Sequence, residues 1–358
     1  MQTSNVENKG KPMNDSTDTS FNPVGLDGME FVEYTSPDPE SLARLFEKLG
    51  FIKVGQHKRK NVELYRQRGI NFILNKEQES FAESFQNAHG PSICATGFRV
   101  KDAEKALKVA IERGAKPCLD KGHTFPAIYG IGDSLIYFVD NYHNDSTYNE
   151  DFDFVEDKVQ KGVELMTIDH MTNNVPKGKM EEWEEFYSKI FNFRVIRFFD
   201  IKGKQTGLLS KAMRSPCNKI CIPINEPTDG KSQIQEYIDE YKGSGIQHIA
   251  LITPDIVRSV KGLKEQGVKF LDTPDTYYEK LKERLPNVTE DIEVLKELRI
   301  LADGDQDGYL LQIFTENMIG PIFFEIIQRK KHDGFGEGNF QALFDSIEED
   351  QRRRGYLK

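Results

Sequence analysis

The two halves of this 358-residue chain repeat one order of elements, and this limits the fold more than any other feature. The first half opens with "GLDGMEFVEYTSPDPESLARLFEKLGFIKVG" and the second with "VELMTIDHMTNNVPKGKMEEWEEFYSKIFNFRVIR". Each reads as a strand, an amphipathic helix and a further strand, because apolar spacing of i, i+3, i+4 indicates a helix and near-alternation a strand. Residues 95–118 and 248–271 then match as strand, helix, glycine and strand.

This repetition predicts an α+β protein of tandem domains, each made of βαβββ units. Such units pair into curved, mixed sheets that form open barrels, with helices outside and a hollow on the concave face. We expect a disordered polar leader over 1–24, a first repeat domain over 25–150 and a second over 151–358. The last residues, from 339 onward, have an apolar stripe that predicts a C-terminal helix.

The charge balance argues against nucleic acid as a partner, because the net charge is −10 and phosphate binding needs a basic face. The longest apolar runs fall short of the roughly 18 residues that a membrane span requires. The polar N-terminus does not resemble a secretory signal. Four cysteines without a C-x-x-C pair indicate a reducing compartment, so we expect a cytoplasmic protein.

The stretch "GPIFFEIIQR", residues 320–329, places Glu325 within an apolar strand. A carboxylate taken out of water must be paired, neutral or bound to a metal, because burying it alone is too costly. Two more strands of the second half have one metal-capable residue each, His170 and His248, at equivalent points of the repeat. Singly, each of the three reads more simply as a core residue or an ion-pair partner.

The first half lacks these residues. Phe31 or Glu30 stands where His170 is expected, and Ala95 or Thr96 where His248 is expected. The second half therefore holds the candidate site, and the first is a degenerate copy. Two imidazoles and one carboxylate with open positions form the facial triad of non-haem Fe(II) oxygenases. Zn²⁺ also accepts these ligands, but it cannot do redox chemistry.

Strand alternation suggests what lines the hollow beside this set. Phe323 shares the face of Glu325, Gln312 and Phe314 share a face of the preceding strand, and Ser210 and Asn225 lie on two others. Aromatic walls with a few amides and hydroxyls suit a flat acid that bears a phenol. The alternative for the aromatic residues is an ordinary core position.

In these residues the chain resembles the 4-hydroxyphenylpyruvate dioxygenase family. The resemblance rests on "IDHMTNNV", "GLLSKAM", "PINEP", "KSQIQEY", "GIQHIAL", "LLQIFT", "GPIFFEIIQR" and "GFGEGNFQALF", in the family's order, and covers nearly all the chain after residue 24. It implies two vicinal-oxygen-chelate-like domains with Fe(II) in the second, held by His170, His248 and Glu325. It further implies that 4-hydroxyphenylpyruvate and O2 react to give homogentisate and CO2, as in tyrosine and phenylalanine catabolism, and that the protein is a homo-oligomer, a dimer or a tetramer.

The resemblance also implies roles for the residues of the pocket. Its catalytic set falls on Ser210, Asn225, Gln233 and Gln312, and its substrate-binding set on Gln247, Phe314, Phe323, Phe335 and Phe340. Strict alternation would turn Gln247 away from the side of His248. The C-terminal helix with Phe335 and Phe340 resembles the family's gate, with Gly336 and Gly338 as a hinge.

Three other readings stay open on the sequence alone. Hydroxymandelate synthase shares the metal, substrate and fold, and an extradiol ring-cleaving dioxygenase shares the ligands but acts on catechols. A metal-free binding protein on the same repeat is the third. Residues 303–308, "DGDQDG", resemble the start of a calcium loop, but Phe314 stands where the twelfth-position Glu belongs, so we predict a hairpin turn there.

Overall fold

The structure, a computed structural model, describes residues 20–120, 122, 124–143, 146–155, 162–202, 206–340, 352 and 355. Residues 1–19 of the predicted leader and residues 341–351 of the predicted C-terminal helix lie outside these ranges. None of the helices within them is long and apolar enough to cross a membrane. The division of the chain into domains at residue 150 remains a prediction.

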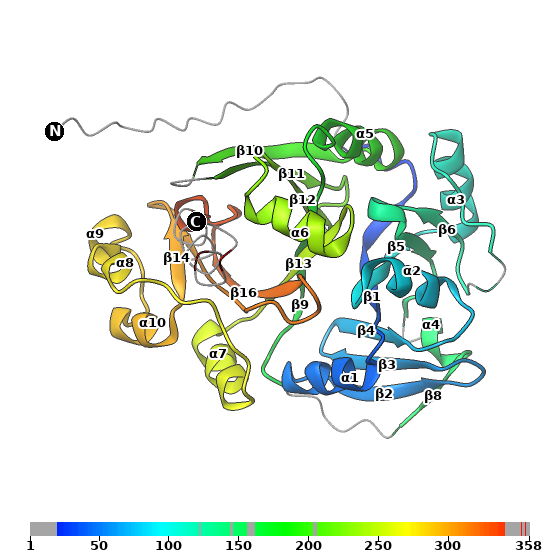
Figure 1. Cartoon of the computed structure of the whole chain (residues 1–358), viewed down its shortest axis with the longest axis horizontal. Coiled ribbons are helices and arrows are strands. Elements are labelled where there is room, and N and C mark those ends of the chain that lie inside the picture. Colours follow the sequence, from blue (N-terminus) through cyan, green and yellow to red (C-terminus); the bar gives the residue numbers. More distant parts are fainter. Residues whose placement is uncertain are drawn as a thin grey trace.

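Two curved mixed sheets, one from each half of the chain, lie side by side with helices around them (Figure 1). The first sheet has the strand order β6-β7-β5-β1-β4-β3-β2-β8. Its strands are β1 (Leu26–Thr35), β2 (Ile52–His57), β3 (Val62–Gln67), β4 (Ile70–Asn75), β5 (Ser92–Val100), β6 (Ala127–Tyr129), β7 (Leu135–Val139) and β8 (Phe152–Phe154). Its helices are α1 (Pro39–Lys48), α2 (Phe81–His89), α3 (Ala103–Glu112), α4 (Ser146–Asn149) and the short 3-10 turn η1 (Ile131–Asp133).

The second sheet has the order β10-β11-β12-β9-β13-β16-β15-β14, so its first seven strands correspond to β2-β3-β4-β1-β5-β7-β6. Its strands are β9 (Thr167–Asn174), β10 (Arg194–Lys202), β11 (Gly207–Arg214), β12 (Cys221–Pro227), β13 (Gly245–Ile252), β14 (Leu301–Gly304), β15 (Tyr309–Phe314) and β16 (Phe323–Lys330). Its helices are α5 (Met180–Phe191), α6 (Gln233–Tyr241), α7 (Ile256–Glu265), α8 (Thr276–Glu279), α9 (Leu281–Arg284) and α10 (Ile292–Leu298). The internal repeat predicted from the sequence is thus confirmed in the order of these seven strands, but β7 corresponds to β16 and not to β15, the strand that the likeness of residues 132–140 to residues 306–315 suggests.

Local sequence signals explain where several helices begin. An Asp or Ser side chain at the N-cap accepts a backbone N–H of the first turn, which satisfies a donor that the helix itself leaves unpaired. These caps are Asp38, Ser80, Asp102, Ser232, Asp255 and Asp291. The predicted hairpin turn at 303–308 is also confirmed, because Gly304 of β14 pairs with Tyr309 of β15.

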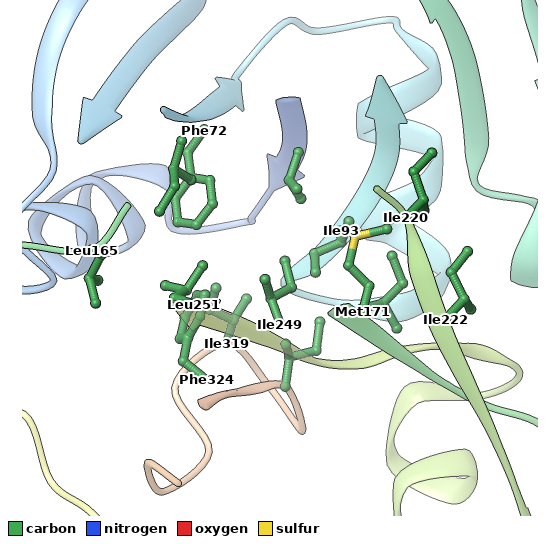
Figure 2. Close-up of a cluster of buried hydrophobic side chains, with 14 of the residues drawn as sticks. Phe72, Ile93, Leu165, Met171, Ile220, Ile222, Ile249, Leu251, Ile319 and Phe324 are labelled. Atoms are coloured by element: carbon green, nitrogen blue, oxygen red, sulfur yellow. The ribbon is translucent and has the colours of Figure 1, made fainter. Parts of the chain in front are cut away.

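The largest hydrophobic core lies between the two sheets (Figure 2). Residues that alternate with the ligand candidates, such as Met171, Ile249 and Phe324, point away from the concave face of the second sheet and into this core. There they join Phe72 and Ile93 of the first sheet, and the rings of Phe72 and Phe324 stack with their centroids 6.1 Å apart. The concave faces of the two sheets therefore lie outside this shared core.

Candidate metal centre

His170 on β9, His248 on β13 and Glu325 on β16 come from three neighbouring strands and converge on the concave face. The register brings them together, because Ala250 of the central strand pairs with His170 on one side and with Glu325 on the other. Glu325 Oε2 lies 3.2 Å from His170 Nε2 and 3.5 Å from His248 Nε2. All three side chains are buried, and one ligand atom from each lies within 4.8 Å of the others. This set can bind a single cation.

A β-bulge precedes each histidine. Along the β9–β13 pairing, Asp169 is passed over between Ile168 and His170, and Gln247 is passed over between Ile246 and His248. A bulge interrupts strict alternation, so two successive side chains can face one side of a sheet. Gln247 accordingly lines the same cavity as His248, although strict alternation predicts that the two side chains face opposite sides of the sheet.

The two bulge residues hold the imidazoles in one orientation. Asp169 Oδ2 lies 2.8 Å from His170 Nδ1, and Gln247 Oε1 lies 3.0 Å from His248 Nδ1. Because both partners are oxygen acceptors, each Nδ1 carries a proton and donates it. The lone pair of a neutral imidazole is then on Nε2, which faces Glu325 and is the atom that binds a metal.

A second set of hydrogen bonds holds Asp169 and Glu325 in place. Arg329 donates to both oxygens of Asp169 at 2.7 Å. On the other side Gln312 Nε2 donates to Glu325 Oε1 at 3.4 Å, and Asn339 Nδ2 donates to Gln312 Oε1 at 3.1 Å. Such contacts behind the ligands set their position and basicity.

The electrostatics favour a cation at the centre. Burial raises the pKa of Glu325, but the charge of His170 and hydrogen bonds from both histidines outweigh it and lower that pKa overall. Burial lowers the pKa of His170, yet the Glu325 charge and the Asp169 hydrogen bond raise it to about 9. Burial also raises the pKa of Asp169, but Arg329 and His170 bring it far below its usual value. The pKa of His248 is lowered, chiefly by burial. Without a metal, a proton on His170 therefore balances the charge of Glu325.

The three ligand candidates open onto a cavity with mostly aromatic and aliphatic walls. It is lined by eight of the pocket residues named above, which are Ser210, Asn225, Gln233, Gln247, Phe314, Phe323, Phe335 and Phe340. Gln312 is outside this lining and contacts Glu325 instead. Phe323 stacks on His248 with ring centroids 4.7 Å apart, and Phe335 meets His170 edge-on at 5.6 Å.

Sequence reasoning missed several residues of this site. Thr172 Oγ1 lies 3.0 Å from His248 Nε2, and Phe199 forms a wall of the cavity, where its ring meets Phe340 at 5.1 Å. Asp169 and Arg329 were missed too. Arg329 had a readable signal, because it follows Glu325 by four residues and alternation puts both on one face. Asp169 had none, since its orientation depends on the bulge.

Comparison with known protein families supports this reading of the two halves. Residues 21–154 match the family model described as hydroxyphenylpyruvate dioxygenase, HPPD, N-terminal. Residues 167–313 match the glyoxalase, bleomycin resistance protein and dioxygenase superfamily. The chain therefore has two tandem domains of the glyoxalase type, as the resemblance predicts.

Individual relatives match nearly the whole chain. Hemolysin VllY of Vibrio vulnificus is 54% identical over 94% of this chain and 98% of its own length. The 4-hydroxyphenylpyruvate dioxygenase of Pseudomonas aeruginosa is 52% identical over 94% of this chain and 97% of its own. Among solved structures, a mutant of 4-hydroxymandelate synthase from Streptomyces coelicolor superposes with a TM-score of 0.79 at 26% identity, covering 91% of this chain and 99% of its own. This chain belongs to the 4-hydroxyphenylpyruvate dioxygenase family.

Proposed function

We propose that this chain is an Fe(II)-dependent dioxygenase that converts 4-hydroxyphenylpyruvate and O2 into homogentisate and CO2. The observation that supports this best is a buried set of two imidazoles and one carboxylate at the base of an aromatic cavity. The reaction balances without another reductant. One oxygen atom of O2 enters the new carboxylate and the other the ring hydroxyl, while the substrate carboxyl leaves as CO2.

The donor set suits iron. Two imidazole Nε2 atoms and one carboxylate oxygen make up the two-histidine, one-carboxylate set of non-haem Fe(II) oxygenases, which would leave positions open for substrate and O2. His170, His248 and Glu325 would hold the iron, which would bind the 2-oxo acid and activate O2, while the substrate itself provides the electrons through its oxidative decarboxylation. We favour iron over Zn²⁺ because this reaction needs a redox-active ion.

The aromatic walls would hold the substrate ring. Phe314, Phe323, Phe335 and Phe340 surround the space beside the ligands, so a flat ring packs between them and water is excluded. Exclusion of water matters because it protects reactive species from side reactions. Phe335 and Phe340 lie near the end of the described chain and would close the cavity over the bound substrate.

The polar side chains of the cavity would orient the substrate's phenol and carboxylate. Ser210, Asn225 and Gln233 lie on β11, β12 and the start of α6, on the side away from β16. Ser210 and Asn225 are direct neighbours across the sheet, and Asn225 donates to Asn174 Oδ1 at 3.3 Å. Gln312 would act through Glu325, whose carboxylate it helps to position.

One experiment tests the activity and its product. The purified protein is given Fe(II), O2 and 4-hydroxyphenylpyruvate without 2-oxoglutarate, and the products are identified by mass spectrometry. Homogentisate with equimolar CO2 is the expected outcome. Hydroxymandelate would move the chain to the activity named for its structural neighbour. Turnover of catechols alone would indicate ring cleavage, and no iron uptake with no turnover would indicate a binding protein.

We also propose, from the family resemblance, that the protein is a homo-oligomer. Light scattering on the eluting peak of a gel-filtration column measures its mass directly. A species of 41.1 kDa, the mass of one chain, would contradict this proposal.

A further inference from the structure

The first sheet encloses a cavity of its own on its concave face, with about 280 Å³ of free space. The matching strand orders allow its walls to be compared with the metal cavity position by position. In the second sheet one row across the strands reads His170, Ala250 and Glu325. The equivalent row in the first sheet reads Phe31, Gly97 and Tyr137. The two cavities are counterparts.

In the first sheet, two aromatic residues and an alanine stand at the positions of the three metal ligands, and the two aromatic rings form the floor of the cavity. Phe31 stands at the position of His170, Tyr137 at that of Glu325 and Ala95 at that of His248. The rings of Phe31 and Tyr137 lie 5.9 Å apart. Gly97 leaves room for them, because a Cβ there would lie 2.6 Å from the Phe31 ring. The bulges persist, since Glu30 and Cys94 are passed over as Asp169 and Gln247 are.

His57 supplies a hydrogen-bond donor on the wall of this cavity, at the position equivalent to Phe199. Its Nδ1 accepts the backbone N–H groups of Arg59 at 3.1 Å and Lys60 at 3.2 Å. The ring proton is therefore on Nε2. His57 is only 7% exposed, and its Nε2 has no hydrogen-bond partner among the described residues. Burial lowers the pKa of His57, which agrees with a neutral ring that keeps this donor. Buried donors normally have a partner, so this one indicates a missing acceptor.

The charged groups around the cavity select against anions. On the same face, Glu33 is 7% exposed and burial raises its pKa; among the described residues its carboxyl accepts from Asn75 Nδ2, at 2.8 Å, and weakly from Cys94. The charged residues among the described lining are five acids and one lysine, which are Glu33, Glu77, Glu79, Asp120, Asp151 and Lys60. Of the acids, Asp151 is paired with Arg59 at 2.7 Å. A carboxylate ligand would meet this acidic excess and be repelled.

We propose that the first domain binds an uncharged phenol in this cavity without a metal. The ring packs against Phe31, Tyr137 and the other aromatic walls, and the hydroxyl oxygen accepts the Nε2–H of His57. The site thus differs in charge preference from the cavity of the second domain, whose proposed substrate is an anion.

The test uses the full chain with 4-methylphenol as the probe and 4-methylbenzoate as its anionic match. Titrations are followed by ligand-observed NMR on chelator-treated protein. We expect saturable binding of 4-methylphenol with a dissociation constant at or below about 1 mM, given the ligand's size, and weaker binding of 4-methylbenzoate. Absence of saturable binding, or tighter binding of the benzoate, would overturn the proposal.

Variants at His57 assign the binding to this cavity. His57→Phe keeps a ring, as Phe199 does in the second domain, but removes the donor, so the affinity for 4-methylphenol falls about five- to tenfold. His57→Gln retains an N–H donor and loses less. Turnover of 4-hydroxyphenylpyruvate by the iron-loaded variants shows that they are folded. If His57→Phe does not fold, His57→Gln decides alone. Because this variant keeps an N–H donor, a loss of affinity for 4-methylphenol of about five- to tenfold would then count against the proposal. Binding unchanged in a folded His57→Phe variant places the phenol elsewhere.

Discussion

Asp169 Oδ2 lies 2.8 Å from Nδ1 of His170, the residue that directly follows it in the chain. Two neighbours in a regular strand face opposite sides, so this contact exists only because Asp169 is at a bulge. Gln247 and His248 repeat the same relationship on the next strand. Each imidazole is thus oriented by the residue before it. The bulge makes this contact possible, and the contact fixes the tautomer of the histidine.

Replacing Asp169 tests this relationship. Asp169→Asn keeps the shape but removes the charge that orients His170 and pairs with Arg329. We expect the affinity for divalent metal to fall by about ten- to a hundredfold. The unfolding temperature should also fall, because Arg329 is left with a neutral partner. Metal titration and thermal unfolding measure the two effects. Asp153→Asn, at an exposed position of β8, is the control and should change neither. Unaltered metal affinity in Asp169→Asn would show that the pair does not support the site.

Replacing Glu325 tests the ligand set itself. Glu325→Gln removes the charge while it keeps the volume, so the fold should persist. Iron occupancy should fall, and turnover should fall by more than about a hundredfold, since a carboxylate ligand is lost. Metal analysis, circular dichroism and product assay follow the three quantities. Glu316→Gln, an exposed position just after β15, is the matched control. Full turnover by Glu325→Gln would remove this residue from the ligand set.

Metal affinity should depend on pH. Without metal the pKa of His170 is about 9, raised from an ordinary value of 6.5 chiefly by the Glu325 charge and the Asp169 hydrogen bond. Below that pKa a proton competes with the metal, so affinity should rise by up to about tenfold per pH unit and level off near pH 9. Competition with a calibrated chelator measures this. A flat profile between pH 6.5 and 9 would mean that His170 does not lose a proton on binding.

The stability of the metal-free protein should change in the opposite sense. A group whose pKa is higher in the folded protein than in the unfolded chain stabilises the fold fully below the unfolded value, and this contribution is lost as pH rises through the folded value. For His170 the window runs from 6.5 to about 9. We expect the unfolding temperature of the chelator-treated protein to decrease across this window. A rise there would contradict the ionised pair of His170 and Glu325.

Gly336 should not tolerate a side chain. Its φ is +79°, and an added Cβ would lie 1.7 Å from Gln312 Oε1. Because Gln312 contacts Glu325, Gly336→Ala should shift the carboxylate and reduce turnover by about tenfold or more. Gly178→Ala is the matched control, since its φ is +81° and its Cβ would meet nothing within 4 Å. Both variants bear the backbone strain, of about 1 kcal/mol, but only the first disturbs Gln312. Equal turnover by the two would refute this coupling.

The three ligand candidates could be predicted because they rest on large-scale regularities. His170 and His248 occupy equivalent points of the repeat, and Glu325 interrupts an apolar strand. The residue types and the order of the strands along the chain were therefore enough to identify all three. The same comparison left two candidates in the first half for the counterpart of each histidine. The strand register shows that Phe31 is the counterpart of His170 and Ala95 that of His248.

What could not be predicted depends on bulges and on contacts between distant strands. Alternation is a rule of regular strands, so it fails at Gln247 and gives no reason to turn Asp169 toward the site. Phe199 and Asn339 join the site through tertiary packing that local patterns do not encode. The catalytic and substrate-binding roles of the individual pocket residues stay predictions.

The stacking of Phe72 against Phe324 places the first domain directly behind the strand that carries Glu325. Separating the two halves would expose to water the apolar faces by which the two sheets pack together. The first half, which lacks the two histidines and the carboxylate of the metal centre, is therefore not dispensable, because its sheet forms the other side of the core against which the second half packs.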